Sequence, residues 1–265
     1  MSTVSNSNLL VEDVRINGHR QPIFVRSFRP QAQARRLPII LYFHGGRFTD
    51  GTLDETNTAC EMFARQVHAW VVSVGYSLAP EFPFPNAVED AHCAMLWARS
   101  EAGGLRADQR HMAVAGHDAG GNIATGFAAV ARDRGDSSIR AQALFAPLLD
   151  PSLTRVGHYS AQEAPWIDTL AASYRAYLPR FSQRVHPYAA PLESCRLAQL
   201  PAAFVASVAR DPLHVEAEHY AASLIAAGVP TECARYANTT RADIATHTPA
   251  LLAAGGFLRR HLDSG

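Results

Sequence analysis

Short apolar runs alternate along the chain with longer segments in which apolar residues recur at helical spacing. Residues 9–16 and 22–28 alternate apolar and polar positions, as strands do when one face is buried. Residues 38–43 and 70–74 are continuously apolar, which is typical of strands covered on both faces of a sheet. We expect further strands at residues 111–115, 143–145, 202–207 and 232–236.

Helical patterns fill the segments between these strands. We expect helices at residues 54–67, 87–97, 122–132, 216–227 and 249–262. Thr248 fits the N-cap of the last helix and Pro249 its first turn. Strands that alternate with helices need right-handed crossovers and a mostly parallel sheet. The pattern therefore predicts an α/β fold with a mostly parallel, eight-stranded sheet flanked by helices.

Residues 151–191 interrupt this alternation. The segment is long and rich in aromatic residues, among them Trp166, Tyr174 and Tyr177. A segment of this kind between two sheet strands is often a lid over an active site. We predict one domain over residues 1–265 with a small lid insertion, and we expect Trp166 and Tyr174 to line a substrate pocket.

Composition excludes several classes of protein. The 265 residues carry equal numbers of basic and acidic side chains, which gives no indication of nucleic-acid binding. The histidines are scattered and the four cysteines form no CxxC pair, so we expect no metal and no cofactor. No stretch approaches the ~20 apolar residues of a membrane span. A cytoplasmic protein with a small-molecule substrate is the expectation.

The strand expected at residues 111–115 runs into Gly116-His117-Asp118-Ala119-Gly120 and then into a helix. Glycines around the central residue permit a sharp turn, which forces that residue into strained backbone geometry with its side chain above the sheet. The N-terminus of the next helix favours negative charge there. The pattern predicts a nucleophile elbow with Asp118 at its tip.

A second glycine-rich turn follows residues 38–43. Consecutive glycines let backbone N–H groups turn inward and stabilise an oxyanion. We predict an oxyanion hole whose donors are Gly45, Gly46, Arg47 and Ala119. His44 and His117 are expected to line the substrate pocket beside it.

These motifs resemble those of the hormone-sensitive-lipase-like esterase branch of the α/β-hydrolases. His44-Gly45-Gly46 resembles the oxyanion motif of that family, and residues 76–85, 187–192 and 211–213 resemble three further motifs in the same order. The resemblance extends from Val11 to Leu262 and implies the α/β-hydrolase fold. The longer N-terminal cap usual in the family is not recognisable, which implies a more open site. A homodimer is left open.

Two residues depart from the family pattern. Arg47 stands where the oxyanion loop has its third glycine; its N–H can still serve, while its side chain can guard the pocket or bind an anion. Asp118 stands where the family has its nucleophilic serine. The elbow is instead similar to those of epoxide hydrolases and dehalogenases of the same superfamily, which form an ester between their aspartate and the substrate.

The resemblance also implies the partners of the nucleophile. Asp211 lies in the Asp-Pro-Leu motif, where the family places the carboxylate that orients a histidine. Two residues are candidates for the position of the catalytic base. Arg241 falls near the usual histidine position, and an arginine cannot act as a base near neutral pH. His247 fits relatives with a longer loop, so we expect His247 to be the base, with Arg241 in the pocket and a missing base as the alternative.

An aspartate nucleophile favours displacement at saturated carbon, because attack on an ester carbonyl would give a high-energy mixed anhydride. Water activated by His247 would then cleave the alkyl-enzyme ester in the oxyanion hole. The sequence therefore predicts a hydrolase for small apolar epoxide- or halide-type substrates. Three alternatives stay open: a binding protein without turnover; a lyase, cyclase or isomerase with Asp118 as general base; and an ordinary carboxylesterase in which Asp118 is an engineered replacement of serine.

Overall fold

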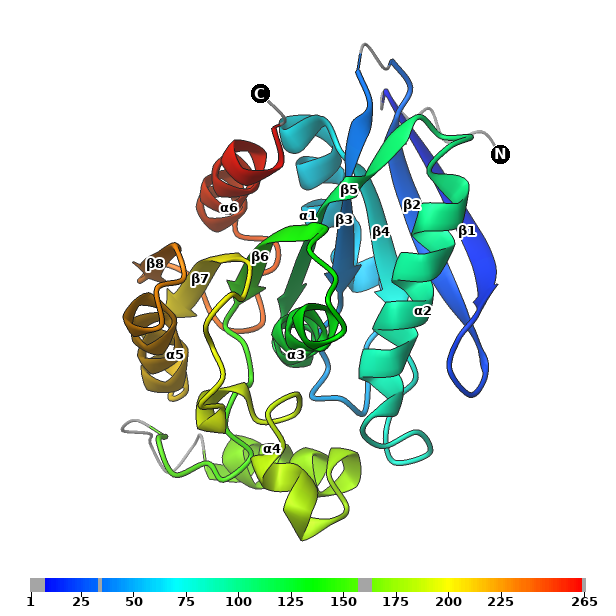
Figure 1. Ribbon diagram of the computed structural model, residues 1–265. Coiled ribbons are helices and arrows are strands. Elements are labelled where there is room, and N and C mark those ends of the chain that lie inside the picture. The colour runs from blue at the N-terminus through cyan, green and yellow to red at the C-terminus, as the bar shows by residue number, and fades with distance from the viewer. Residues whose placement is uncertain (1–7, 33–34, 157–163, 264–265) are drawn as a thin grey trace, which may run out of the picture.

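The computed structural model describes residues 8–32, 35–156 and 164–263. Its centre is an eight-stranded sheet in the order β1-β2-β4-β3-β5-β6-β7-β8 (Figure 1). β2 pairs in an antiparallel manner with β1 on one side and with β4 on the other, and every other pairing is parallel. The predicted mostly parallel, eight-stranded sheet is confirmed. The strands are β1 (Leu9–Asn17), β2 (Pro22–Pro30), β3 (Leu37–Phe43), β4 (Trp70–Gly75), β5 (Ala107–His117), β6 (Ile139–Phe145), β7 (Ala202–Val208) and β8 (Thr231–Tyr236).

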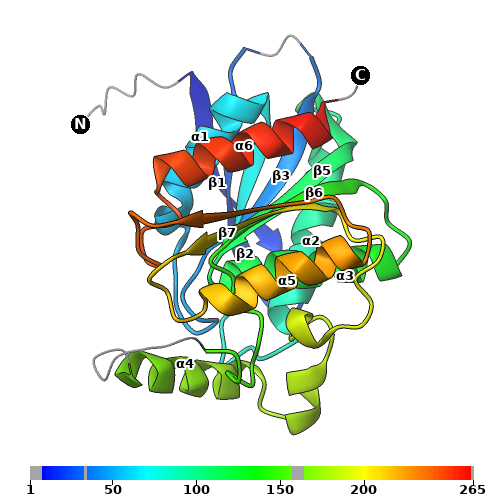
Figure 2. The same ribbon diagram turned by 90° about the vertical axis from the view of Figure 1, so that its left-hand side faces the viewer.

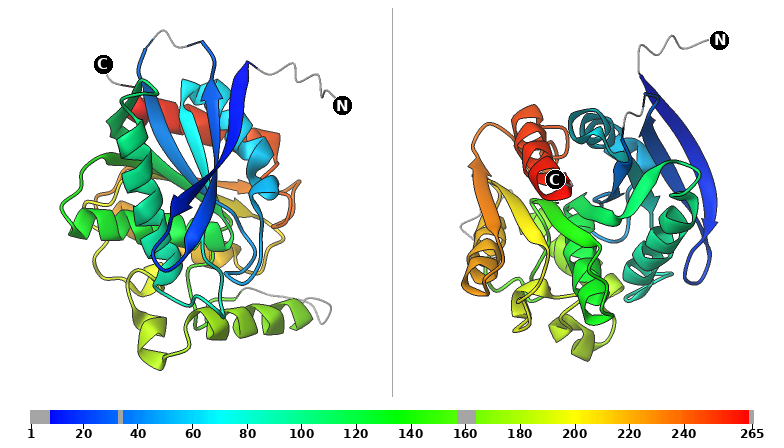
Figure 3. Two further views of the ribbon diagram at one scale, coloured as in Figure 1. Left: turned by 90° about the vertical axis from the view of Figure 1, so that its right-hand side faces the viewer. Right: turned by 45° about the horizontal axis from the view of Figure 1, so that its top comes forward.

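Strand composition matches position in the sheet. Every residue of β3 and β7 is buried, which fits their continuous apolar sequences and their places inside the sheet. β1 lies at the edge of the sheet, where only Leu9 and Ile16 of its nine residues are buried. Figure 3 shows the antiparallel pair β1 and β2 at one edge of the sheet, with β7 and β8 at the opposite edge.

The helices form one layer on each face of the sheet (Figure 2). α2, α3 and α5 cover one face, and α1 and α6 cover the other. The helix expected at residues 54–67 is divided into a 3-10 turn (Leu53–Thr56), α1 and a π-helical turn (Ala64–His68). The helices are α1 (Asn57–Phe63), α2 (Asn86–Glu101), α3 (Ala119–Asp133), α4 (Ala164–Tyr177), α5 (His214–Ala226) and α6 (Thr248–Leu262).

α4 stands apart from both layers, beyond the carboxyl ends of the parallel strands (Figures 1 and 2). Its buried face packs against the loop after β3. There the ring centroid of Phe48 lies 5.4 Å from that of Tyr174 and 4.0 Å from that of Tyr177. Residues 157–163 of the expected lid lie outside the described residues. The position of α4 fits a lid, and that role stays a prediction. No described helix has the length and apolar character needed to cross a membrane.

Candidate active site

Asp118 lies at the turn between β5 and α3, as the elbow motif predicts. Its backbone has φ 53° and ψ −121°, a region that non-glycine residues rarely adopt, so the turn is strained. A Cβ atom on Gly120 would lie 2.1 Å from the carbonyl oxygen of Phe43, so only glycine allows α3 to start this close to β3. The turn raises the Asp118 carboxylate above the sheet.

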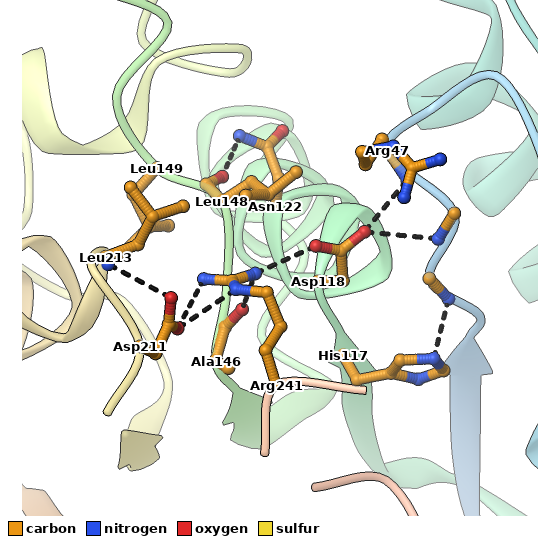
Figure 4. Close-up of polar contacts among 12 residues, drawn as sticks. Arg47, His117, Asp118, Asn122, Ala146, Leu148, Leu149, Asp211, Leu213 and Arg241 are labelled. Carbon is orange, nitrogen blue, oxygen red and sulfur yellow. Dashed lines mark hydrogen bonds and ion pairs between the residues drawn. The ribbon is translucent and has the colours of Figure 1, made fainter. Parts of the chain in front are cut away.

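The carboxylate of Asp118 occupies the predicted oxyanion hole. Its Oδ2 accepts hydrogen bonds from the backbone N–H groups of Gly46 (3.1 Å) and Arg47 (2.8 Å), as Figure 4 shows. Gly45 was expected to be a further donor, but its N–H donates to Nε2 of His117 at 3.0 Å instead. That part of the prediction is wrong, because the loop turns the Gly45 N–H toward the histidine ring. The N–H groups of Gly46 and Arg47, predicted to stabilise a substrate oxyanion, thus already hold an anion that belongs to the chain.

Arg241, from the loop after β8, holds the other oxygen of Asp118. Its Nη1 donates to Asp118 Oδ1 at 2.8 Å and to the carbonyl oxygen of Ala146 at 2.7 Å. Its Nε and Nη2 lie 3.0 and 2.8 Å from Oδ2 of Asp211. One guanidinium therefore bridges the two carboxylates that were predicted to be nucleophile and triad acid (Figure 4).

Charge and burial together set the protonation of Asp118 and Arg241. Burial raises the pKa of Asp118, but the charge of Arg241 and the N–H groups of Arg47 and Ala119 outweigh burial and hold that pKa below its usual value. Burial also lowers the pKa of Arg241, yet the charges of Asp211 and Asp118 raise it overall. Asp118 and Arg241 are thus both ionised at neutral pH. A carboxylate with a low pKa and both oxygens hydrogen-bonded is a weak nucleophile and a weak base.

His247 does not reach this bridge. It is the N-cap residue of α6, and its ring packs edge-on against Tyr236 with centroids 5.2 Å apart. The hydrogen bonds of the described residues include none from the His247 ring to Asp118 or Asp211, and its Nδ1 is buried without a partner. Oδ1 of Asp211 accepts the N–H of Leu213 instead, at 3.0 Å. The predicted Asp211–His247 pair does not form, and Arg241, the alternative, takes its place because its longer side chain spans both carboxylates.

A cavity of about 920 Å³ opens over the bridge. It fits a small organic ligand. The residues expected in the pocket that do line the cavity are His117, Trp166 and Arg241. The Cζ atom of Arg241 lies 5.5 Å from the centroid of the Trp166 indole ring, which α4 supplies. This is a cation–π contact. α4 thus touches the bridge directly.

Two other residues expected in the pocket lie behind its wall. His44 is buried, stacks on Tyr76 at 4.2 Å between ring centroids, and has its pKa lowered to about 4 by burial. Tyr174, on the buried face of α4, packs against Phe48. Neither lines the cavity, because their rings fill the space between the loop after β3 and its neighbours.

Two buried acids near the bridge were missed by the sequence analysis. Glu216, on α5, accepts the N–H of Leu149 at 3.1 Å, and burial raises its pKa to about 8. Asp150 is completely buried close to it. A signal was present in the sequence: Glu216 shares its helical face with Ala217, Tyr220 and Leu224, all of which are buried.

Comparisons with known proteins identify the family of this fold. A family model described as alpha/beta hydrolase fold, Abhydrolase_3, matches residues 40–242. The chain belongs to this α/β-hydrolase family. Esterase LipI of Mycobacterium tuberculosis is 40% identical over 236 residues, which cover 84% of this chain and 72% of that protein. Ethyl acetate hydrolase of Pseudomonas putida is 33% identical over 239 residues, which cover 87% and 72%.

Solved esterase structures have the same fold as this α/β-hydrolase. EstE1, a thermostable carboxylesterase cloned from a metagenomic library, superposes with a TM-score of 0.88 at 31% identity, covering 98% of this chain and 92% of that one. An esterase of Pyrobaculum calidifontis superposes with a TM-score of 0.84 at 33% identity, covering 95% and 85%. The predictions of an α/β-hydrolase fold, of the hormone-sensitive-lipase-like esterase branch and of a hydrolase are confirmed.

Proposed function

We propose that this α/β-hydrolase binds small carboxylic esters in the cavity above Asp118, and that its present side chains hydrolyse them very slowly at most. The ester class is supported by its relatives, which include proteins named as an esterase and as an ethyl acetate hydrolase. The slow chemistry rests on one observation: the Arg241 guanidinium stands between Asp118 and Asp211, where a serine esterase needs a histidine. We keep the cytoplasmic location and the homodimer as predictions from the sequence.

Each step of acyl transfer meets an obstacle at this site. Asp118 has no hydroxyl to acylate, and attack by its carboxylate on an ester would give a mixed anhydride. Arg241 cannot accept a proton near neutral pH. The N–H groups of Gly46 and Arg47 are engaged by Asp118, and loss of one such donor typically costs about 100- to 1000-fold in rate.

The epoxide or halide reaction predicted from the sequence has less support than the ester class of the carboxylesterase alternative. A displacement needs a free carboxylate oxygen, and both oxygens of Asp118 are bound. Cleavage of the resulting ester needs a base, and Arg241 occupies the position where a base would stand. The relatives named above are esterases.

The bridge also bears on what a serine alone could do. In Asp118→Ser, Arg241 would still lie against Asp211, so the serine would have no base. In Arg241→His, the histidine would face a carboxylate rather than a hydroxyl. We therefore expect that a working triad requires both substitutions, since catalytic residues that act as a unit are strongly non-additive.

The decisive experiment compares four proteins on p-nitrophenyl acetate: the unaltered chain, Asp118→Ser, Arg241→His and the double variant. The double variant should exceed either single variant by roughly 100-fold or more, because only it has nucleophile, base and acid together. Adding Asp211→Asn to the double variant should remove most of the gain. An unaltered chain that is faster than the folded double variant would refute the proposal. A parallel titration with ethyl butyrate should show saturable binding to the unaltered chain.

A further inference from the structure

Arg47 has a side chain that its backbone does not favour. Its φ is 51°, in the left-handed region where glycine is the least strained residue. The backbone task of Arg47 is to donate its N–H to Asp118 at 2.8 Å, and a glycine would perform it equally well. A bulky residue kept in strained geometry at a functional loop points to a role for the side chain itself.

The side chain of Arg47 has a donor without an acceptor. Its Nε is buried, and among the described residues no group accepts a hydrogen bond from it. Arg47 lines the cavity, on the opposite side of Asp118 from Arg241 (Figure 4). Nε itself is too buried to meet a ligand, but no hydrogen bond or ion pair of the described residues engages the two terminal guanidinium nitrogens of Arg47 either. These nitrogens can donate to an acceptor that enters the cavity.

The charges around the cavity indicate which kind of hydrogen-bond acceptor it can admit. The wall carries three arginines, Arg47, Arg210 and Arg241, and these are outnumbered by its acids. The lining acids are Asp50, Glu55, Asp118, Asp211 and Asp243. A cavity with this excess of negative charge disfavours an anion and admits an uncharged acceptor such as a carbonyl oxygen.

We propose that Arg47 is the carbonyl-binding residue of this cavity: its guanidinium donates to the carbonyl oxygen of a neutral ester. The reason is that Asp118 excludes the ligand carbonyl from its usual position. The oxyanion hole, which would hold that oxygen, is filled by Asp118, so the ligand carbonyl takes its hydrogen bond from the next cationic donor on the wall. This inference rests on the proposed function, namely that small esters bind here.

The test uses two ligands that differ only at the carbonyl. Ethyl butyrate and butyl ethyl ether share chain length and ether oxygen, and only the ester has the carbonyl. Affinity for each is measured by titration of ¹⁵N-labelled protein, followed at the indole N–H of Trp166, which lines the cavity. A hydrogen bond to a charged donor gives the ester a roughly tenfold to hundredfold tighter Kd than the ether.

Three variants locate the source of this preference. Arg47→Met keeps the backbone strain and removes the donor, and Arg47→Gly removes both; the preference for the ester should disappear in each. Arg210→Met is the matched control, because Arg210 is an exposed arginine on the same cavity wall, and it should keep the preference. A preference that survives in both Arg47 variants would overturn the inference and leave the proposed function standing. Absence of ester binding to the unaltered chain would overturn both.

Discussion

Replacing Arg241 with methionine should destabilise the fold strongly. Methionine fills much of the same volume but leaves Asp118 and Asp211 buried without the cation that lies 2.8 Å from each. It also removes a donor from the carbonyl of Ala146. Removing one partner of a buried ion pair typically costs about 3–5 kcal/mol. We expect a loss in the free energy of unfolding within that range at pH 7.

The loss should depend on pH with a definite sign. In the unaltered chain the lowered pKa of Asp118 contributes stability that is present above the unfolded pKa near 3.8 and is lost as pH falls through the lower folded pKa. Without Arg241, burial leaves the same carboxyl with a raised pKa, so the variant loses stability as pH rises through the acidic range. The difference in the free energy of unfolding between the unaltered chain and Arg241→Met should therefore be largest at neutral pH and become smaller toward pH 4.

Denaturation with guanidinium chloride, followed by circular dichroism at pH 7 and pH 4.5, measures the loss in the free energy of unfolding and its dependence on pH. Arg65→Met is a suitable control, because Arg65 forms an exposed pair with Glu61 at 2.9 Å. Exposed pairs of this kind contribute about 0–1 kcal/mol. A loss for Arg241→Met no larger than that of the control, or one that is the same at both pH values, would refute the claim that Arg241 holds a buried Asp118 carboxylate in its ionised form.

Three further outcomes follow from single side chains. Glu216→Gln should raise the free energy of unfolding by about 2–4 kcal/mol at pH 8 and change it little at pH 5, because a folded pKa of about 8 means that unfolding releases a proton in between; equal effects at both pH values in denaturant titrations would contradict this. His247→Gln should leave ester affinity and the hydrolysis rate unchanged, and a clear fall in either would return His247 to the site. Gly120→Ala should yield no stably folded protein by circular dichroism, because its Cβ would lie 2.1 Å from the carbonyl oxygen of Phe43; thermal stability equal to that of the unaltered chain would contradict this.

The scaffold of the site could be predicted because its signals are local. The alternation of strand and helix patterns predicts the sheet, and the glycines around Asp118 predict the elbow, since each depends on a few neighbouring residues. The same holds for Gly46 and Arg47, whose N–H groups do act as anion donors, here to Oδ2 of Asp118. Only which anion they bind could not be foreseen.

The bridge could not be predicted because it depends on how far side chains reach across the fold. Arg241 and His247 lie in one loop, and sequence spacing alone does not decide which of them extends to Asp118, 123 residues from Arg241. The direction of the Gly45 N–H depends on the place of His117, which is 72 residues away. Glu216 is different, because its position on the apolar face of a helix could have been predicted from the sequence.

The carboxylate held by Gly46 and Arg47 also decides how this protein behaves toward covalent reagents. Fluorophosphonates and sulfonyl fluorides label esterases by phosphonylating or sulfonylating a serine hydroxyl, with loss of fluoride, while an oxygen of the reagent lies among the N–H donors. Here the elbow offers no hydroxyl, and that oxygen would meet Oδ2 of Asp118. A chain with the architecture of an esterase would therefore stay unlabelled in surveys that detect serine hydrolases by such probes, and a method that reports occupancy of the cavity is needed to follow it.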